Sequence, residues 1–203
     1  MPPPAPPAPR LGARRNRAAG PRWFVALALL GLVVAVFHPM REHDFTGYDD
    51  NYHVTDNPHL RSGLTPENVA LAFTESFSAI RAHARGRPHR ALEWRWMPLT
   101  TISFQLDYEL YGLEPAGFLF TNAVLHALST LLLFAALMRM TRAMWRSAFV
   151  AAVFAVHPLH VEPVAWVAAR PDALAGVFWM LGILSWARYA ERPSLGAYGI
   201  VAL

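Results

Sequence analysis

Two adjacent carboxylates, Asp49 and Asp50, are the first residues in the sequence that could carry chemistry. They stand between Tyr48 and His53 in the segment FTGYDDNYH. A carboxylate in this setting can act as a general base, bind a cation or accept hydrogen bonds from sugar hydroxyls. Glycine, aspartate and asparagine are also ordinary turn formers, so a solvated turn is the competing interpretation.

A second polar group occurs in the segment HPLHVEPVAWVAARPD, which interrupts an otherwise apolar part of the chain. Its members are His157, His160, Glu162, Arg170 and Asp172. Such groups at a membrane edge are costly unless they are paired or functional. An active-site role is one interpretation, and helix capping with an ion pair from Arg170 to Glu162 or Asp172 is the other. Metal ligation is less favoured, because His-x-x-His-x-Glu lacks the helical spacing of zinc peptidases.

Arg95 is a candidate phosphate ligand, because Trp94 and Trp96 flank it and would hold it near the membrane interface. Asn122 and His126 stand four residues apart on one helical face inside an apolar run. For these two residues, interhelical hydrogen bonds are the simplest prediction.

The elements that must position these groups are membrane spans. Hydrophobic residues make up 54% of the 203 positions and charged residues 16%, and the apolar residues gather in long runs rather than in a soluble amphipathic pattern. All 18 basic residues are arginine, which is typical of a GC-rich genome and suggests a bacterial source. The net charge of +4 does not indicate nucleic-acid binding, because the arginines stand where membrane topology would put them. The absence of cysteine excludes a disulfide framework and a thiolate metal site within these residues.

The resulting prediction is an all-α polytopic protein of the bacterial inner membrane. Its N-terminus is expected to lie in the cytoplasm by the positive-inside rule. The predicted segments are a disordered basic tail (1–22), a first span (23–40), an extracytoplasmic loop domain (41–115), a second span (116–138), a cytoplasmic loop (139–146), a third span (147–157), an outer turn (158–172), a fourth span (173–189) and the start of a fifth (190–203).

The large loop carries 11 of the 14 acidic residues and no stretch apolar enough to span a bilayer, so it is expected to lie outside. Thr65, Pro66 and Glu67 predict a helix start, followed by an apolar-periodic run to Ile80. A second helix is predicted from Pro98 to Tyr111, with an apolar side suited to the bilayer surface. A loop of this size is more often functional than accidental.

The order of these pieces is similar to a known family. YDDNYHVTDNP follows the first span, WMPLTTISFQLDYELYGLEPAGF precedes the second, TNAVLHALSTLLLF lies within it, and HPLHVEPVAWVAARPDALAGVFWML crosses the third and fourth. From about Phe45 to Tyr189 the chain resembles the N-terminal membrane region of the TMTC-like proteins. These are transmembrane and tetratricopeptide repeat glycosyltransferases of the GT-C class, related to protein O-mannosyltransferases.

The resemblance implies a GT-C-like region whose large first extracytoplasmic loop carries an acidic catalytic motif, matched here by Asp49 and Asp50. Such enzymes move a sugar, here expected to be mannose, from a polyprenyl-phosphate donor to a hydroxyl acceptor such as protein Ser or Thr. The roles that follow are Asp49 or Asp50 as the base, His157, His160 and Glu162 as further catalytic groups, and Arg95, Arg170 and Asp172 on the substrate side. A divalent cation stays open as a cofactor, and no metal ligands are assigned.

The alternative hypothesis is a non-catalytic membrane scaffold or a transporter segment, motivated by the polar residues inside the spans. A transporter would show repeat-related broken helices. The apolar run that begins at Tyr198 is too short to span, so the chain is expected to be a piece of a longer protein and inactive by itself.

Overall fold

The computed structural model describes residues 20–74 and 96–202, and all regular secondary structure in those ranges is helical. The helices are α1 (Gly20–Phe37), η1 (His38–Glu42), η2 (Asn51–Thr55), α2 (Pro58–Arg61), α3 (Pro66–Thr74), α5 (Pro98–Tyr111), α6 (Pro115–Thr141), α7 (Met144–Val156), η3 (Pro158–His160), α8 (Val161–Ala165), η4 (Val167–Ala169), α9 (Arg170–Glu191) and α10 (Leu195–Ala202). Three helices are long and apolar enough to cross a membrane, or four spans if one bent pair is counted as a span. The prediction of an all-α polytopic membrane protein is confirmed.

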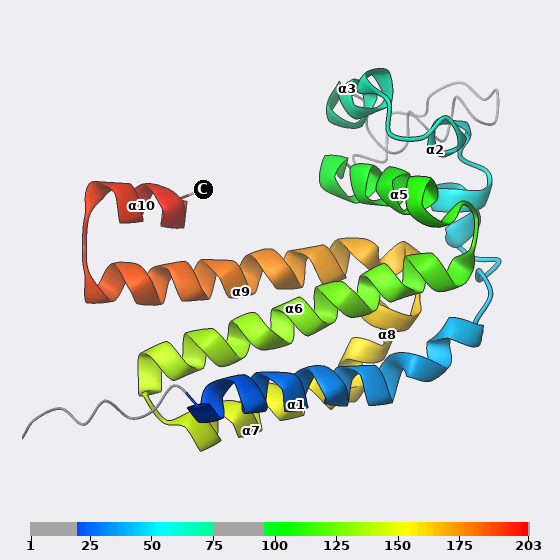
Figure 1. Ribbon diagram of the computed structural model, residues 1–203. Coiled ribbons are helices and arrows are strands. Elements are labelled where there is room, and N and C mark those ends of the chain that lie inside the picture. The colour runs from blue at the N-terminus through cyan, green and yellow to red at the C-terminus, as the bar shows by residue number, and fades with distance from the viewer. Residues whose placement is uncertain (1–19, 75–95, 203) are drawn as a thin grey trace, which may run out of the picture.

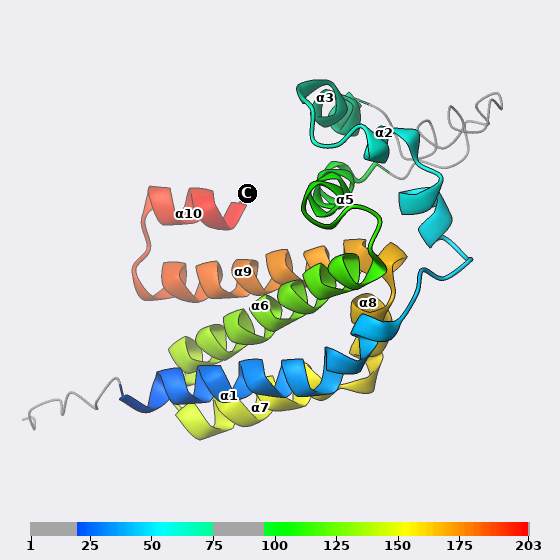
Figure 2. The same cartoon turned by 45° about the vertical axis from the view of Figure 1, so that its right-hand side comes forward.

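A bundle of α1, α6, α7 and α9 forms the membrane part. Figures 1 and 2 show α6 between α9 on one side and α1 on the other, with α7 beside α1. At about 1.5 Å per residue, the 27 residues of α6 extend about 40 Å and the 22 residues of α9 about 33 Å, against a hydrocarbon core of about 30 Å. The last helix, α10, reverses direction and lies along α9 (Figure 1).

The third crossing is a bent pair. The 13 residues of α7 extend only about 20 Å, which is too short for a straight span. The chain breaks before Pro158, because proline disfavours helical backbone in the residue that precedes it. It then continues through Pro158–Ala165 at an angle of 52°. The third span predicted at 147–157 therefore needs this bent continuation to cross a bilayer.

The helices η2, α2, α3 and α5 form a helical layer at one end of the bundle. Figure 1 shows α2, α3 and α5 gathered where α6 and α9 begin. The hydroxyl of Thr65 accepts a hydrogen bond from the Asn68 amide at 3.2 Å, as expected for the predicted helix start. The predicted extension of that helix to Ile80 runs beyond Thr74 and lies outside the described residues, as does Arg95. The helix predicted from Pro98 to Tyr111 is present as α5.

The apolar side of α5 is divided between two environments. Phe104 is 3% exposed and joins the protein core, whereas Leu99, Leu106 and Leu110 are exposed. The side of the helix that carries the three leucines is therefore available to the bilayer surface or to other protein, while the Phe104 side holds α5 against the bundle.

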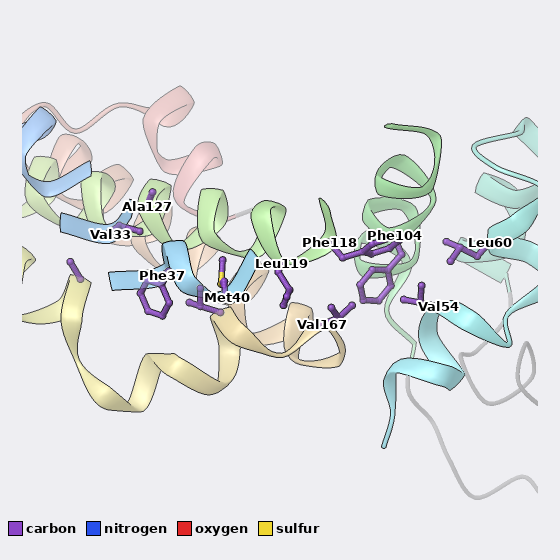
Figure 3. Close-up of a cluster of buried hydrophobic side chains, with 12 residues drawn as sticks. Val33, Phe37, Met40, Val54, Leu60, Phe104, Phe118, Leu119, Ala127 and Val167 are labelled. Carbon is purple, nitrogen blue, oxygen red and sulfur yellow. The ribbon is translucent and has the colours of Figure 1, made fainter. Parts of the chain in front are cut away.

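One core cluster joins the helical layer to the bundle. Figure 3 shows buried apolar side chains that continue from the bundle into the layer. They are Val33, Phe37 and Met40 of the first crossing, Leu119 and Phe118 of α6, Val167 of η4, and Phe104, Val54 and Leu60 of the layer. Burial of apolar surface across this boundary fixes the layer on the bundle.

Candidate functional site

Asp50 connects the helical layer to the turn before α9 through hydrogen bonds. The residue is only 1% exposed. Its Oδ2 atom accepts hydrogen bonds from the Thr46 amide at 2.8 Å and from the Thr46 hydroxyl at 3.0 Å. Oδ1 accepts one from the amide of Ala168, 118 residues further along the chain, at 2.8 Å. A carboxylate committed to three donors in a buried place positions backbone rather than accepting a substrate proton.

Asp49 differs from its neighbour. It is half-buried, and its carboxylate has no hydrogen bond or ion pair to any residue in ranges 20–74 and 96–202. Its backbone carbonyl accepts from the amides of Tyr52 and His53 at 3.0 and 3.2 Å, which begins the helical turn of η2. The backbone of Asp49 is therefore fixed while its side chain stays available to a ligand.

Two aromatic rings accompany this carboxylate. Tyr48 is 75% exposed, and its ring centroid lies 6.3 Å from that of Trp166, on the turn that Asp50 binds. The amide of Asn122 in α6 donates to the Trp166 carbonyl at 3.0 Å. Tyr48 and Trp166 thus meet at the junction of the layer with the bundle, and Asp49 follows Tyr48 directly in the chain. An exposed aromatic ring at this place can contact an apolar sugar face.

Arg170 lies at the centre of a buried polar network. Its Nη2 pairs with Asp107 Oδ2 at 2.6 Å, with both side chains 2% exposed or less. The same nitrogen donates to the Phe118 carbonyl at 2.8 Å, Nη1 donates to Ser103 Oγ at 3.2 Å, and Nε donates to Asn122 Oδ1. The guanidinium also lies 4.8 Å from the centre of the Phe104 ring. One side chain therefore connects α5, α6 and α9.

This environment corrects the ion pair considered for Arg170. Its partner is Asp107 rather than Glu162 or Asp172, both of which are exposed. The predicted substrate-side role of Arg170 is also disfavoured, because the side chain is 0% exposed and protein acceptors use its three nitrogens. A buried cation surrounded by acceptors positions helices rather than binding an incoming phosphate.

Burial of the Asp107 carboxylate costs solvation free energy, and the groups around it offset only part of that cost. Burial raises the pKa of Asp107, while the Arg170 guanidinium and the Thr121 hydroxyl, which donates at 2.7 Å, counteract part of that effect. Desolvation of two charges commonly offsets their attraction. The Arg170–Asp107 ion pair therefore fixes the position of α5 rather than adding much to the free energy of unfolding.

The remaining predicted residues separate into two environments. His160 and Asp172 line a cavity of about 280 Å³ between α6, α8 and α9, together with His126, Ser129 and Trp179. The His160 ring lies 5.0 Å from that of His126 and 4.3 Å from that of Phe154. His157 and Glu162 are exposed, and His157 Nδ1 accepts from the Leu159 amide at 3.3 Å as a helix cap.

The predicted hydrogen bonds inside the second span are present. Asn122 bonds to Trp166 and Arg170, and the Nε2 atom of His126 lies 3.0 Å from the Ala155 carbonyl of α7. Within ranges 20–74 and 96–202, no group of three or more His, Cys, Asp or Glu side chains is arranged to hold a metal ion.

Sequence comparison relates this arrangement to known proteins. The mouse protein O-mannosyl-transferase TMTC1 is 34% identical over 150 residues, which cover 73% of this chain and 15% of the mouse protein. The human protein O-mannosyl-transferase TMTC4 is 28% identical over 193 residues, or 88% of this chain and 25% of the human one. The chain is TMTC-like. The fruit-fly protein O-mannosyl-transferase Tmtc2 is 37% identical over 102 residues, or 50% of this chain and 11% of the fly protein.

The TMTC-like resemblance predicted from the motifs is thereby confirmed. No protein-family model and no solved structure matches the chain. The chain spans less than a third of the length of each of these relatives, so the activity in their names belongs to much longer proteins.

Proposed function

We propose that this TMTC-like chain supplies part of a membrane glycosyltransferase site, at which a sugar passes from a polyprenyl-phosphate donor to a hydroxyl acceptor. The observation that supports this most is the contrast within the acidic pair. Asp50 is buried and committed to the Thr46 and Ala168 donors, while the neighbouring Asp49 carboxylate has no partner in the described part of the chain. Asp49 is therefore the base in this proposal, and Asp50 positions it.

The chemistry follows from that assignment. The Asp49 carboxylate takes the proton of the acceptor hydroxyl, and the hydroxyl oxygen forms a bond to the anomeric carbon of the sugar. The bond between that carbon and the phosphate oxygen breaks, and the polyprenyl phosphate leaves with the bonding electrons. A cation near the leaving phosphate would stabilise its charge. Arg95 is kept for that role, since Arg170 is buried in the network with Asp107.

The names of the relatives support mannose as the sugar and a protein hydroxyl as the acceptor, because they describe protein O-mannosyl-transferases. A GT-C architecture is part of the same proposal. His160 and Asp172 are proposed to face the reaction through their shared cavity, whereas exposed His157 and Glu162 would need substrate, or protein outside these residues, to engage them.

The donor class can be tested directly with membranes that contain the complete protein. Mannose carried on polyprenyl phosphate is expected to label an acceptor peptide rich in serine and threonine, because the base then acts opposite a lipid phosphate leaving group. Labelled nucleotide mannose, with lipid-linked donor synthesis blocked, should give no product. Direct transfer from the nucleotide sugar under that block would contradict the proposed donor.

The proposed orientation predicts which residues reagents can reach. Tyr48 and Trp145 are about equally exposed, at 75% and 74%, but lie at opposite ends of the bundle. In intact cells, a membrane-impermeant maleimide is expected to label Tyr48→Cys, whereas Trp145→Cys should react only after the membrane is opened. The 203 residues contain no cysteine, so protein without either change measures the background. The reverse labelling pattern would contradict the orientation and with it an extracytoplasmic site.

A further inference from the structure

An apolar groove runs along the outside of the first two crossings, away from Asp49 and from the cavity at His160. It has a volume of about 400 Å³ and lies between α1, η1 and α6. Figure 3 shows Val33, Phe37 and Met40 from the first crossing facing the region of Leu119 and Ala127 in α6. These five residues line the groove and form its floor.

The length of the groove corresponds to one leaflet of a bilayer. On one wall it extends from Leu30 in the middle of α1 to Arg41 in η1, which is about 18 Å at helical rises of about 1.5 and 2.0 Å per residue. On the other wall it extends from Ala116 to Ala127, about 16 Å. Half of a hydrocarbon core of about 30 Å has the same depth.

Charge distinguishes the two ends of the groove. Its inner part is apolar, and its basic lining residues, His38 and Arg41, both stand at the end nearest the helical layer. The Arg41 side chain is 61% exposed and approaches Glu42 at 3.6 Å. An exposed ion pair of that length is weak, and Glu42 does not line the groove. The guanidinium is therefore available to an anion at the level of the lipid headgroups.

The lining of the groove indicates the kind of occupant. Apolar side chains line it over the depth of one leaflet, and its basic residues stand at one end only. The combination of a leaflet-deep apolar groove with cations at its polar end matches a lipid whose acyl chain lies inside and whose anionic headgroup lies at the rim.

We propose that this groove is a binding site for an anionic phospholipid of the outer leaflet, with one acyl chain along Val33, Phe37 and Leu119 and its phosphate at Arg41 and His38. The bound lipid would fill the space between α1 and α6 and strengthen their packing. The inference is independent of the proposed transferase activity, because it uses none of the residues assigned to that reaction.

The test is native mass spectrometry of the complete protein in mild detergent, titrated with phosphatidylglycerol or phosphatidylcholine of the same chain length. Wild type is expected to retain phosphatidylglycerol preferentially. Arg41→Gln should weaken that binding about fivefold, as expected for loss of one basic contact, and reduce the preference. Arg146→Gln, an exposed arginine at the opposite end of the bundle, should leave it unchanged.

Filling the groove provides a second test. Ala123→Leu places a larger side chain in the groove and should reduce binding of both lipids at least fivefold, whereas Ala135→Leu adds the same atoms at an exposed position of α6 outside it. If Ala123→Leu does not fold, Ala116→Leu at the rim replaces it.

Equal retention of both lipids by wild type, or unchanged binding in the filled variants, would overturn the proposal. The proposal would also be overturned if the groove held copurified polyprenyl phosphate. The same holds if it bound no lipid because another helix of the complete protein covers it.

Discussion

Replacement of Asp107 with leucine is expected to lower the free energy of unfolding by about 3–5 kcal/mol. The change leaves the Arg170 guanidinium 0% exposed with only the neutral acceptors Ser103, Asn122 and Phe118 around it. Arginine cannot lose its proton to escape that cost. Denaturant unfolding of the complete protein in mild detergent measures the loss, with far-ultraviolet circular dichroism to follow the helices.

The reciprocal change should cost less. In Arg170→Met the Asp107 carboxyl remains, and because burial already raises its pKa, it can take up a proton and become neutral. The double variant Asp107→Leu, Arg170→Met is expected to recover most of the stability, since an apolar pair of similar volume needs no ionic partner. Equal, additive losses in the two single variants would contradict the assignment of Arg170 and Asp107 as one coupled pair.

Much of the helical framework was predictable from the sequence, because long apolar runs and helix-start residues act locally. The bounds of α5 and the cap at Thr65 follow from Pro98 and from the order Thr, Pro, Glu. The bend of the third crossing had a local signal in Pro158, but its angle and continuation through Ala165 depend on packing against α6 and α9.

The partner of Arg170 was not predicted, because Asp107 lies 63 residues earlier in the chain, with α6, α7, η3, α8 and η4 between them. A signal did exist in α5. Asp107 follows Phe104 by three residues and Thr100 by seven, and all three lie on the buried side of the helix. A carboxylate on an otherwise buried face requires a cation, although the sequence does not say which one.

The difference between Asp49 and Asp50 was likewise beyond sequence reasoning. Both are acidic residues in one turn, and their spacing in the sequence does not show which of the two is the base. The distinction arises from the Ala168 amide, which reaches Asp50 only after α8 and η4 have turned the chain back toward the helical layer. Tertiary contacts of this kind decide which of two equivalent side chains remains available.

Asp49→Asn is expected to reduce sugar transfer by about 10²–10⁴-fold while leaving folding intact. The amide has nearly the shape of the carboxylate but cannot take the proton of the acceptor hydroxyl. The native Asp49 side chain makes no hydrogen bond or ion pair within the described ranges that folding would lose. Asp50→Asn should behave differently. It presents an amide group to the donors of Thr46 and Ala168, so it is expected to lower stability and activity together.

The central claim is tested most directly by the initial rate of mannose transfer from its polyprenyl-phosphate donor to a serine-containing peptide. The complete protein is compared with Asp49→Asn and with Asp44→Asn, an exposed aspartate in the same loop, in amounts matched by immunoblot and with matched unfolding midpoints. The proposal predicts transfer by wild type and Asp44→Asn, and a loss of at least about a hundredfold in Asp49→Asn. Undiminished transfer by Asp49→Asn would contradict its role as the base, and a folded wild type without any transfer would favour a scaffold instead.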